Sequence, residues 1–224
     1  MKFFLDTASI DSITSWKSFG LVDGVTTNPT LLSKESNEPV KVLQEICKIV
    51  KGDVSAQVTY SDSKEMVEQA NFLKSLSKNI VIKLPCTLDG IKASKILIKK
   101  NTKINITLGF DPAQLSIFRN LNIKYFSFII GKVEDYGENN LIKLPFLKKI
   151  VKRLNPNIKL LLASIRNEKH LYESIISDAE VITVPPSTWE KVYNNLHTIR
   201  GEKDFFKAWK SLSKEKRSIY ASKK

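Results

Sequence analysis

Eight short runs of β-forming residues alternate along this chain with longer stretches of helical periodicity. In the intervening stretches apolar residues recur at helical spacing, as in Val42, Ile46, Ile49 and Val50. Strands separated by helices pair in parallel, and eight of them close most economically into a (β/α)8 TIM barrel of the α/β class. A doubly wound sheet is the rival, but the G-x-G-x-x-G turn of a dinucleotide-binding fold is absent. We predict strands over Phe3–Asp6, Gly24–Asn28, Val54–Val58, Ile80–Leu84, Ile104–Leu108, Tyr125–Ile130, Lys159–Ser164 and Val181–Val184.

No linker, low-complexity tract or shift of composition divides the 224 residues. We therefore predict one barrel domain over 1–224, in which about 188–224 form a C-terminal helical extension. This tail has more helix than one barrel repeat requires. Its apolar stripe is equally compatible with packing on a neighbouring subunit and with capping its own barrel. The stripe consists of Phe205, Phe206, Trp209 and Leu212.

Composition excludes several classes of protein. No apolar run reaches the roughly 18 residues that a membrane span needs, so we expect no membrane partner. The N-terminus meets Asp6 too early for a secretory signal. Only two cysteines, Cys47 and Cys86, and two histidines are present, without metal-binding spacing. We expect a cytoplasmic protein that binds no metal.

The net charge of +13 raises the possibility of nucleic-acid binding. However, 31 of the 36 basic residues are lysine, whereas readers of bases and phosphates favour arginine interleaved with aromatic residues. The lysines are scattered over every segment, which is typical of solvated helix faces and favours anionic metabolites as partners. A basic scaffold or nucleic-acid-binding barrel remains the non-enzymatic alternative.

Lys83 stands inside the most apolar run of the chain, Ile80–Pro85. A strand this apolar is buried on both faces, where an unpaired ammonium is costly. Such a lysine tends to lose its proton, and the neutral amine is a nucleophile towards carbonyls. The alternative is a lysine whose stem lies along the strand while its charge reaches water.

Polar residues mark the carboxyl ends of six other predicted strands, where barrel enzymes place their chemistry. Asn105 and Thr107 lie two residues apart and therefore point to one face, as do Ser164 and Arg166. We predict that this face is the barrel interior. Together with Lys83, the set is Asp6, Asn28, Gln57, Asn105, Thr107, Ser127, Ser164 and Arg166.

Two of these residues have competing interpretations. Asp6 precedes a predicted helix start, but we assign the N-cap to Thr7 or Ser9, which leaves Asp6 free as an acid or base. Arg166 is either a surface charge or, with Ser164 and Lys132, a ligand for phosphate.

These segments together resemble the transaldolase family, specifically its short type, which includes the fructose-6-phosphate aldolases. The resemblance covers nearly the whole chain, strand by strand. The combination of Gly-Val-Thr-Thr-Asn-Pro with a Lys-x-Pro strand is its most specific part. The matching pieces are Phe4–Thr7, Gly24–Thr30, Val81–Pro85, Asn105–Leu108, Gly131-Lys132 and Ala163–Arg166.

The resemblance implies a class I aldol mechanism that needs no cofactor. Lys83 would form an iminium with the C2 carbonyl of a ketose phosphate, and Asp6 would take the proton of the C4 hydroxyl. The dihydroxyacetone unit would remain as an enamine until an aldehyde acceptor enters. The resemblance further assigns Gln57 and Thr107 to the lost water, Asn28, Asn105 and Ser127 to the enamine, and Lys132, Ser164 and Arg166 to the phosphate.

Three positions bear on which member of the family this is. Gln57 stands where transaldolases commonly carry Glu and fructose-6-phosphate aldolases carry Gln. Phe128 is assigned to the position where those aldolases have Tyr and transaldolases Phe, and it has no hydroxyl that could protonate the enamine. Lys132 replaces the usual Arg, which exchanges a two-pronged phosphate contact for a point charge.

On balance the resemblance implies a transaldolase of the pentose phosphate pathway. It would convert sedoheptulose 7-phosphate and glyceraldehyde 3-phosphate to erythrose 4-phosphate and fructose 6-phosphate. A fructose-6-phosphate aldolase that releases dihydroxyacetone is the alternative. A ring-like homo-oligomer such as a decamer is also implied.

Overall fold

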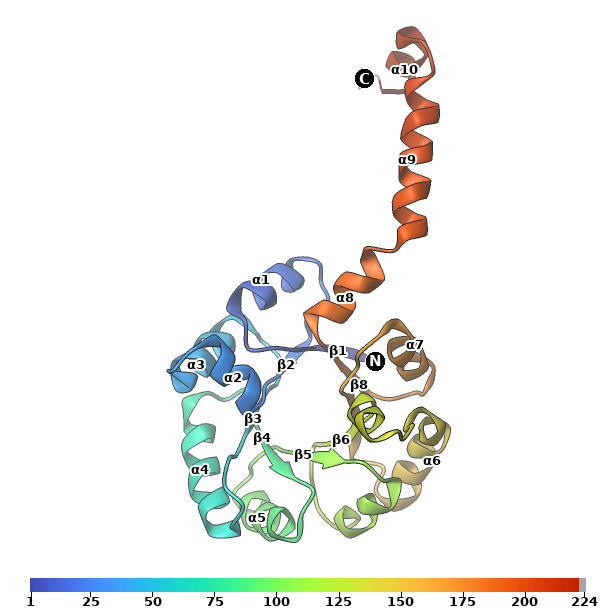
Figure 1. Cartoon of the computed structure of the whole chain (residues 1–224). Helices are drawn as coiled ribbons and strands as arrows, with labels where there is room; N and C mark the ends of the chain where they lie inside the picture. Colours follow the sequence, from blue (N-terminus) through green and yellow to red (C-terminus); the bar gives the residue numbers. More distant parts are fainter. Residues whose placement is uncertain (222–224) are drawn as a thin grey trace. The chain divides into compact units, whose positions relative to one another are not determined.

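The computed structural model describes residues 1–221, and its first 188 residues build a closed barrel of eight parallel strands. The strands follow one another around the barrel in sequence order, and β8 closes on β1, as Figure 1 shows. The predicted (β/α)8 fold is confirmed. The strands are β1 (Lys2–Asp6), β2 (Gly24–Thr26), β3 (Val54–Gln57), β4 (Ile80–Pro85), β5 (Ile104–Gly109), β6 (Tyr125–Ile129), β7 (Lys159–Ala163) and β8 (Val181–Val184).

Helices ring the strands (Figure 1). A 3₁₀ turn takes the place of the helix between β5 and β6, and two 3₁₀ turns precede the helix between β6 and β7. The helices of this part are α1 (Ile10–Ser18), α2 (Pro29–Glu35), α3 (Pro39–Ile49), α4 (Ser63–Leu76), α5 (Leu88–Lys99), α6 (Leu144–Leu154), α7 (Glu168–Ile176) and the start of α8 (Pro186–Tyr193). The 3₁₀ turns are η1 (Pro112–Phe118), η2 (Gly131–Tyr136) and η3 (Leu141–Lys143).

Four strands end one or two residues earlier than predicted: β2, β3, β6 and β7. For β2 and β7 the reason is local. β2 stops at Thr26 because Asn28 is the N-cap of α2, where its side chain accepts a hydrogen bond from the Leu31 N–H at 2.9 Å. β7 stops at Ala163 because Ser164 adopts a left-handed conformation with φ of 63°. At the start of α1, Ser9 is the N-cap, as predicted.

The barrel interior changes from apolar to polar along the strands. One buried layer consists of Phe4, Val81, Tyr125, Leu161 and Val181. Because side chains alternate along a strand, the residue two positions further on each strand faces the same interior, closer to the carboxyl end. Those residues are Asp6, Lys83, Ser127, Ala163 and Thr183. The barrel interior therefore has an apolar layer and, closer to the carboxyl ends of the strands, a more polar layer.

The described residues from 189 to 221 belong to a second compact unit. It contains α9 (Leu196–Lys210), capped by Asn195, and α10 (Lys214–Ala221). The predicted stripe splits within this unit. Trp209 makes an edge-to-face contact with Tyr220 at 4.9 Å between ring centroids, whereas Phe205 and Phe206 are exposed.

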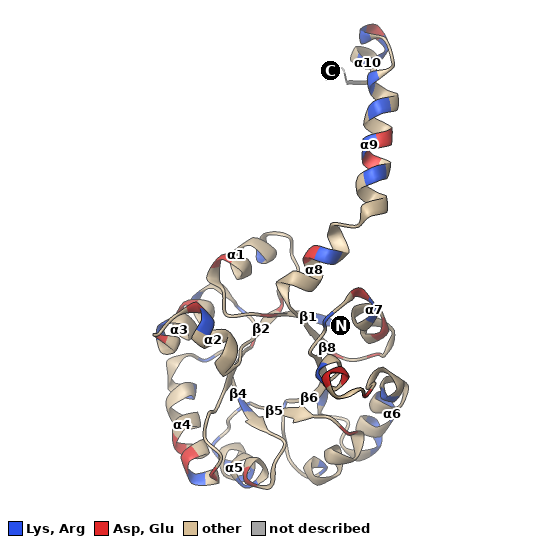
Figure 2. Cartoon of the chain, in the orientation of Figure 1, with Lys and Arg blue, Asp and Glu red and all other residues tan. Residues whose placement is uncertain are grey.

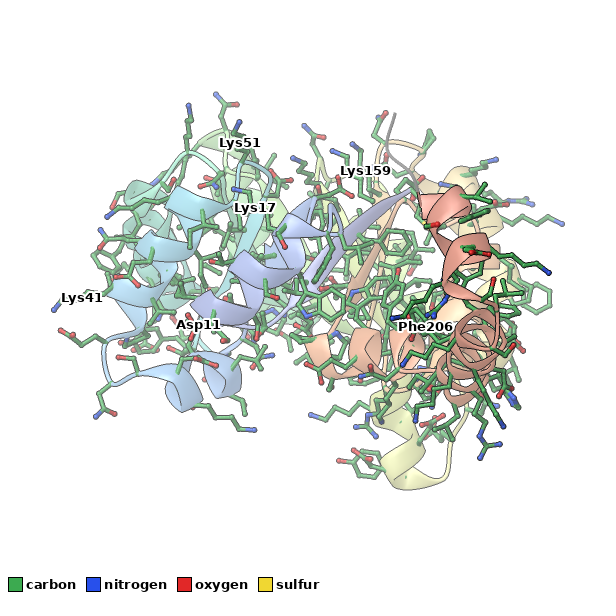
Figure 3. The ribbon with its side chains drawn as sticks, turned by 90° about the horizontal axis from the view of Figure 1, so that it is seen from above. Asp11, Lys17, Lys41, Lys51, Lys159 and Phe206 are labelled. Carbon is green, nitrogen blue, oxygen red and sulfur yellow. The ribbon has the colours of Figure 1, made fainter. Side chains whose placement is uncertain are left out.

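Charged residues are dispersed over the helices with both signs interspersed, as Figure 2 shows. Lys41 and Lys51 are exposed and extend away from the ribbon in Figure 3. Over residues 1–221, no helix has the length and apolar character to cross a membrane.

Candidate active site

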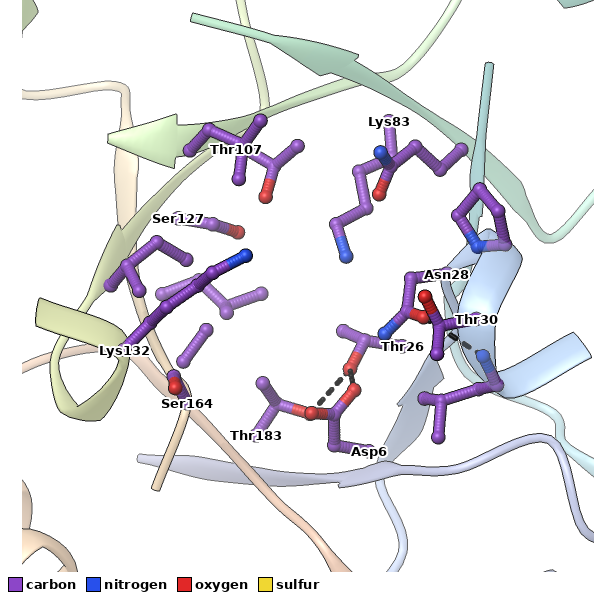
Figure 4. A pocket seen from close by; sticks show the side chains of 17 residues that line it. Asp6, Thr26, Asn28, Thr30, Lys83, Thr107, Ser127, Lys132, Ser164 and Thr183 are labelled. Atoms are coloured by element: carbon purple, nitrogen blue, oxygen red, sulfur yellow. Dashed lines mark hydrogen bonds between the residues drawn. The ribbon is translucent and has the colours of Figure 1, made fainter. Parts of the chain in front are cut away.

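A cavity of about 480 Å³ opens at the carboxyl ends of the barrel strands. Most of the side chains around it are polar, and they point inward from opposite sides in Figure 4. Its polar lining consists of Asp6, Thr26, Asn28, Thr30, Gln57, Lys83, Thr107, Ser127, Lys132, Ser164 and Thr183.

Lys83 extends from β4 into this cavity (Figure 4). The residue is only 9% exposed, and its Nζ donates a hydrogen bond to the Thr27 carbonyl oxygen at 3.1 Å. Burial lowers the pKa of Lys83, and the negative charge of Asp6 opposes this shift in part. A lowered pKa means that the neutral, nucleophilic amine is populated at lower pH than in an ordinary lysine. The side chain therefore does not reach out to bulk water.

Asp6 extends into the same cavity from β1, and a hydrogen bond holds its carboxylate in place (Figure 4). The Thr26 hydroxyl donates to Asp6 Oδ1 at 2.8 Å and lies 2.6 Å from the Thr183 hydroxyl. Burial raises the pKa of Asp6, whereas the charge of Lys83 and the hydrogen bond from Thr26 act in the opposite direction. A buried carboxyl group with a raised pKa is a candidate for proton exchange with a bound molecule.

Asn28 serves both the fold and the cavity. Its side-chain oxygen is committed to the N-cap of α2. The amide nitrogen, a donor of two hydrogen bonds, remains available to the cavity that the residue lines. Pro29 at the first helical position fixes the backbone where the strand turns into the helix.

Asn105 lies beneath the cavity and does not line it, so it would not contact a substrate directly. The side chain is fully buried, donates to the Ser55 hydroxyl at 3.2 Å and accepts from the Ser127 hydroxyl at 2.7 Å. The reason is depth: Asn105 faces the interior two residues before Thr107, which lines the cavity. Asn105 therefore orients Ser127, which does reach the cavity.

Thr107 and Gln57 form another part of the wall, at the ends of β5 and β3. Thr107 is 2% exposed, and the backbone after it turns left-handed at Leu108, with φ of 61°. This irregularity coincides with a shift of register between β5 and β6. Gln57 is half-buried and is paired in register with Lys83 on the neighbouring strand.

The assignment of Phe128 to the cavity is wrong. Ser127 and Ile129 line the cavity, so the alternation of β6 turns Phe128 to the opposite face, where it is fully buried. Ile129 therefore occupies the wall position that was assigned to Phe128. Phe128 was expected not to protonate an enamine because it has no hydroxyl. Ile129 has no hydroxyl either, so the expectation is the same for Ile129.

The prediction that Ser164 and Arg166 point inward together is also wrong. Lys132 and Ser164 line the cavity, but Arg166 does not. The Arg166 guanidinium binds both carboxylate oxygens of Asp135, at 2.6 and 2.9 Å. The left-handed backbone at Ser164 ends the strand alternation, so the two-residue rule does not extend to Arg166.

Sequence reasoning missed several residues of the cavity. Thr26 is paired in register with Asp6, and Thr183 lies on β8 at an interior position. The alternation of Val181, Ile182 and Thr183 could have revealed the latter. The turn at Leu108 has no signal in the sequence, because its side chain is typical of a strand.

The cavity combines three chemical capabilities. Lys83 supplies an amine, which is a nucleophile towards carbonyls when it is neutral, and Asp6 supplies a carboxyl group, which can accept or give up a proton. Lys132 extends into the cavity from the side of β6 and η2 and presents a positive charge (Figure 4). Over residues 1–221, no cluster of three or more His, Cys, Asp or Glu residues is placed to hold a metal ion.

Comparison with known proteins agrees with this arrangement. Residues 3–223 match the family described as transaldolase/fructose-6-phosphate aldolase. A probable transaldolase of Nitrosopumilus maritimus is 38% identical over 221 residues, which cover 98% of this chain and 99% of that protein. A probable transaldolase 2 of Listeria monocytogenes is 38% identical over 215 residues, with 96% and 99% covered.

The fold is shared more widely. A crystal structure of 3-hexulose-6-phosphate synthase superimposes with a TM-score of 0.61 at 15% identity, covering 88% of this chain and 93% of that one. At this identity the likeness concerns the barrel alone. The match over nearly the whole sequence is what identifies the relatives: the chain belongs to the transaldolase/fructose-6-phosphate aldolase family.

Proposed function

We propose that this transaldolase-type enzyme transfers a dihydroxyacetone unit between sugar phosphates through a Schiff base on Lys83. The donor would be sedoheptulose 7-phosphate and the acceptor glyceraldehyde 3-phosphate, as in the pentose phosphate pathway. The observation that carries the proposal is the buried Lys83 amine, whose pKa is lowered by burial, opposite the Asp6 carboxyl in one cavity.

The first step joins the enzyme to the donor. The neutral Nζ of Lys83 attacks the C2 carbonyl, and the resulting carbinolamine loses water to give an iminium. Thr107 and Gln57 border the space beside Lys83 and would hold this water. Gln57 orients water through its amide and cannot itself relay a proton.

Carbon–carbon cleavage follows from the iminium. Asp6 accepts the proton of the C4 hydroxyl, the C3–C4 bond breaks, and its electron pair moves into the iminium to give an enamine. Asn28 and Ser127 would hold the hydroxyl groups of the enamine, with Asn105 orienting Ser127. The acceptor then enters and the same steps run in reverse.

The substrate phosphate would bind at the opposite side of the cavity. Lys132 and Ser164 line that side and offer an ammonium group and a hydroxyl, both of which bind phosphate oxygens. We include Arg166 in this group, although its guanidinium must first leave Asp135.

Transfer is favoured over cleavage by what surrounds the enamine. Ile129 lines the cavity and has no proton to give, so an enamine would persist until an acceptor arrives. Gln57 favours the second candidate, a fructose-6-phosphate aldolase, because the resemblance assigns glutamine at this position to those aldolases.

Two measurements test the proposal. Borohydride added in the presence of donor should leave a mass adduct on Lys83. Incubation with sedoheptulose 7-phosphate and glyceraldehyde 3-phosphate should then yield fructose 6-phosphate. Accumulation of free dihydroxyacetone would favour the aldolase, and absence of any adduct would contradict both.

The setting of the enzyme is part of the proposal. The two free thiols, Cys47 and Cys86, support a reducing compartment, for which we propose the cytoplasm. The exposed Phe205 and Phe206 of α9 support a homo-oligomer, such as the decamer that the resemblance implies. Lysines dispersed among acidic residues support sugar phosphates as the anionic partners, not nucleic acid.

A further inference from the structure

One ion pair lies directly beside the phosphate side of the cavity without being part of it. Arg166 and Asp135 form a two-pronged pair between the segment after β7 and the turn η2. The stem of Arg166 crosses Gly131, so closely that a Cβ at that glycine would lie 2.8 Å from Arg166 Cδ. The same Cβ would lie 2.5 Å from the Ser164 carbonyl oxygen, so a side chain at position 131 would clash with the backbone after β7 as well as with Arg166.

The same corner contains both cavity residues that would bind phosphate. Lys132 follows Gly131 directly, and the Gly131 N–H donates to the Ser164 carbonyl oxygen at 3.0 Å. Arg166 follows Ser164 by two residues. The backbone of Arg166 therefore lies close to those of Lys132 and Ser164, although its guanidinium is turned towards Asp135.

We propose that Asp135 is a specificity-determining residue that competes with the phosphate ester of the substrate for Arg166. This inference rests on the proposed function. Asp135 holds the Arg166 guanidinium outside the cavity, and a phosphate group that binds in the cavity draws the guanidinium towards Lys132. The side chains of Arg166 and Asp135 are 40% and 52% exposed. Exposed pairs of this kind contribute little stability, so a phosphate dianion can displace the carboxylate.

The turn η2 does not depend on Asp135 for its position. The adjacent acid, Glu134, binds His170 with 2.7 Å between Oε1 and Nε2, and His170 is 1% exposed on α7. The Gly131 N–H provides a further link to the segment after β7. These contacts separate competition from a merely structural role, because they hold the turn when Asp135 is changed.

The test compares Asp135→Asn with wild type in full-length enzyme. Competition predicts a KM for the phosphorylated ketose donor that is about two- to fivefold lower, with little change in kcat, as expected for an exposed pair. Glu138→Gln is the matched control, because it removes one negative charge from an exposed position after the same turn. This control should leave KM within about 1.5-fold of wild type.

A second variant shows whether the effect passes through Arg166. Arg166→Met should raise KM for the phosphorylated donor, and adding Asp135→Asn to it should then have no effect. Calorimetric titration measures the affinity for inorganic phosphate without requiring turnover. Asp135→Asn should raise this affinity in the wild-type background and leave it unchanged in the Arg166→Met background.

Two results would overturn the inference. A KM or phosphate affinity unchanged by Asp135→Asn would mean that no competition exists. A KM raised as far as in Arg166→Met would mean that Asp135 positions the turn. Trapping of unphosphorylated dihydroxyacetone on Lys83 by borohydride is measured in parallel. If wild type cannot be trapped, the proposed function itself is contradicted. If wild type is trapped but Asp135→Asn has no effect, only the inference about Asp135 is contradicted.

Discussion

The two sides of the cavity are built differently. The side that holds Lys83 and Asp6 is largely buried, and both side chains are bonded to the β2 segment. Asp6 accepts from Thr26 on β2, and Lys83 donates to the Thr27 carbonyl oxygen directly after β2. The side that holds Lys132 and Ser164 lies on a 3₁₀ turn and a strand end, with an exposed ion pair beside it. If the proposed function holds, the difference means that the barrel fixes the reactive groups, whereas the proposed phosphate contacts can adjust to different substrates.

Replacing the amine should have the largest effect and tests the reactive side directly. Lys83→Met should lower kcat/KM by about 10⁴-fold or more, because the covalent intermediate is lost. The trapped adduct should disappear completely. Lys132→Met is the matched control, since it removes a lysine from the same cavity but should retain trapping of unphosphorylated dihydroxyacetone. Retained activity in Lys83→Met would remove its proposed role.

Removing the carboxylate should have the next largest effect and should separate binding from proton transfer. Asp6→Asn should lower kcat by about 10²- to 10⁴-fold, the usual contribution of a proton-transferring group. The charge of Asp6 raises the pKa of Lys83, so its removal should lower that pKa further and shift trapping to lower pH. Stopped-flow kinetics and a pH series of trapping measure the two effects. A shift to higher pH would contradict the coupling.

The phosphate side should respond mainly in KM. Lys132→Met should raise KM for phosphorylated donors by about tenfold, which corresponds to one charge-assisted contact, and leave unphosphorylated donors unaffected. Lys132→Arg should instead lower KM, because a guanidinium offers a two-pronged contact. Parallel assays with fructose 6-phosphate and fructose measure the difference. Equal effects on both donors would show that the lysine does not read the phosphate.

A change below the cavity should affect stability more than activity. Ser55→Ala removes the partner that accepts a hydrogen bond from the Asn105 amide and leaves that buried donor unsatisfied. We expect a loss of about 1–3 kcal/mol in the free energy of unfolding, measured by urea denaturation. Activity should fall only slightly, since Ser127 retains its bond to Asn105. Ser33→Ala on the exposed side of α2 is a control that should change stability little.

The sequence was most informative where regular strand geometry applies. Runs of β-forming residues separated by helical stretches predicted the eight strands. Polar residues at the predicted strand ends selected Asp6, Lys83, Thr107 and Ser127, which all line the cavity. Strand alternation, applied two residues beyond Ser127 on β6, would have selected Ile129. Phe128 was instead assigned by resemblance, and the face of the strand decided against it.

Prediction failed where the backbone leaves the strand or where distant residues meet. The left-handed turn at Ser164 redirects Arg166, and nothing in a serine at that position signals the turn. Asp135 lies 31 residues from Arg166 in sequence, so their pairing depends on the closed barrel. The depth of Asn105 could not be predicted either, because it depends on the stagger between strands.

The account depends on a neutral amine at Lys83, and its reactivity as a function of pH is the most direct test. The protein is treated with dihydroxyacetone and cyanoborohydride between about pH 6 and pH 10, and adducts on Lys83 and the exposed Lys41 are quantified by mass spectrometry. Lys83 should reach half of its maximal labelling well below pH 10.5, the ordinary pKa of lysine. Labelling of Lys83 that follows Lys41 across the whole range would contradict the account.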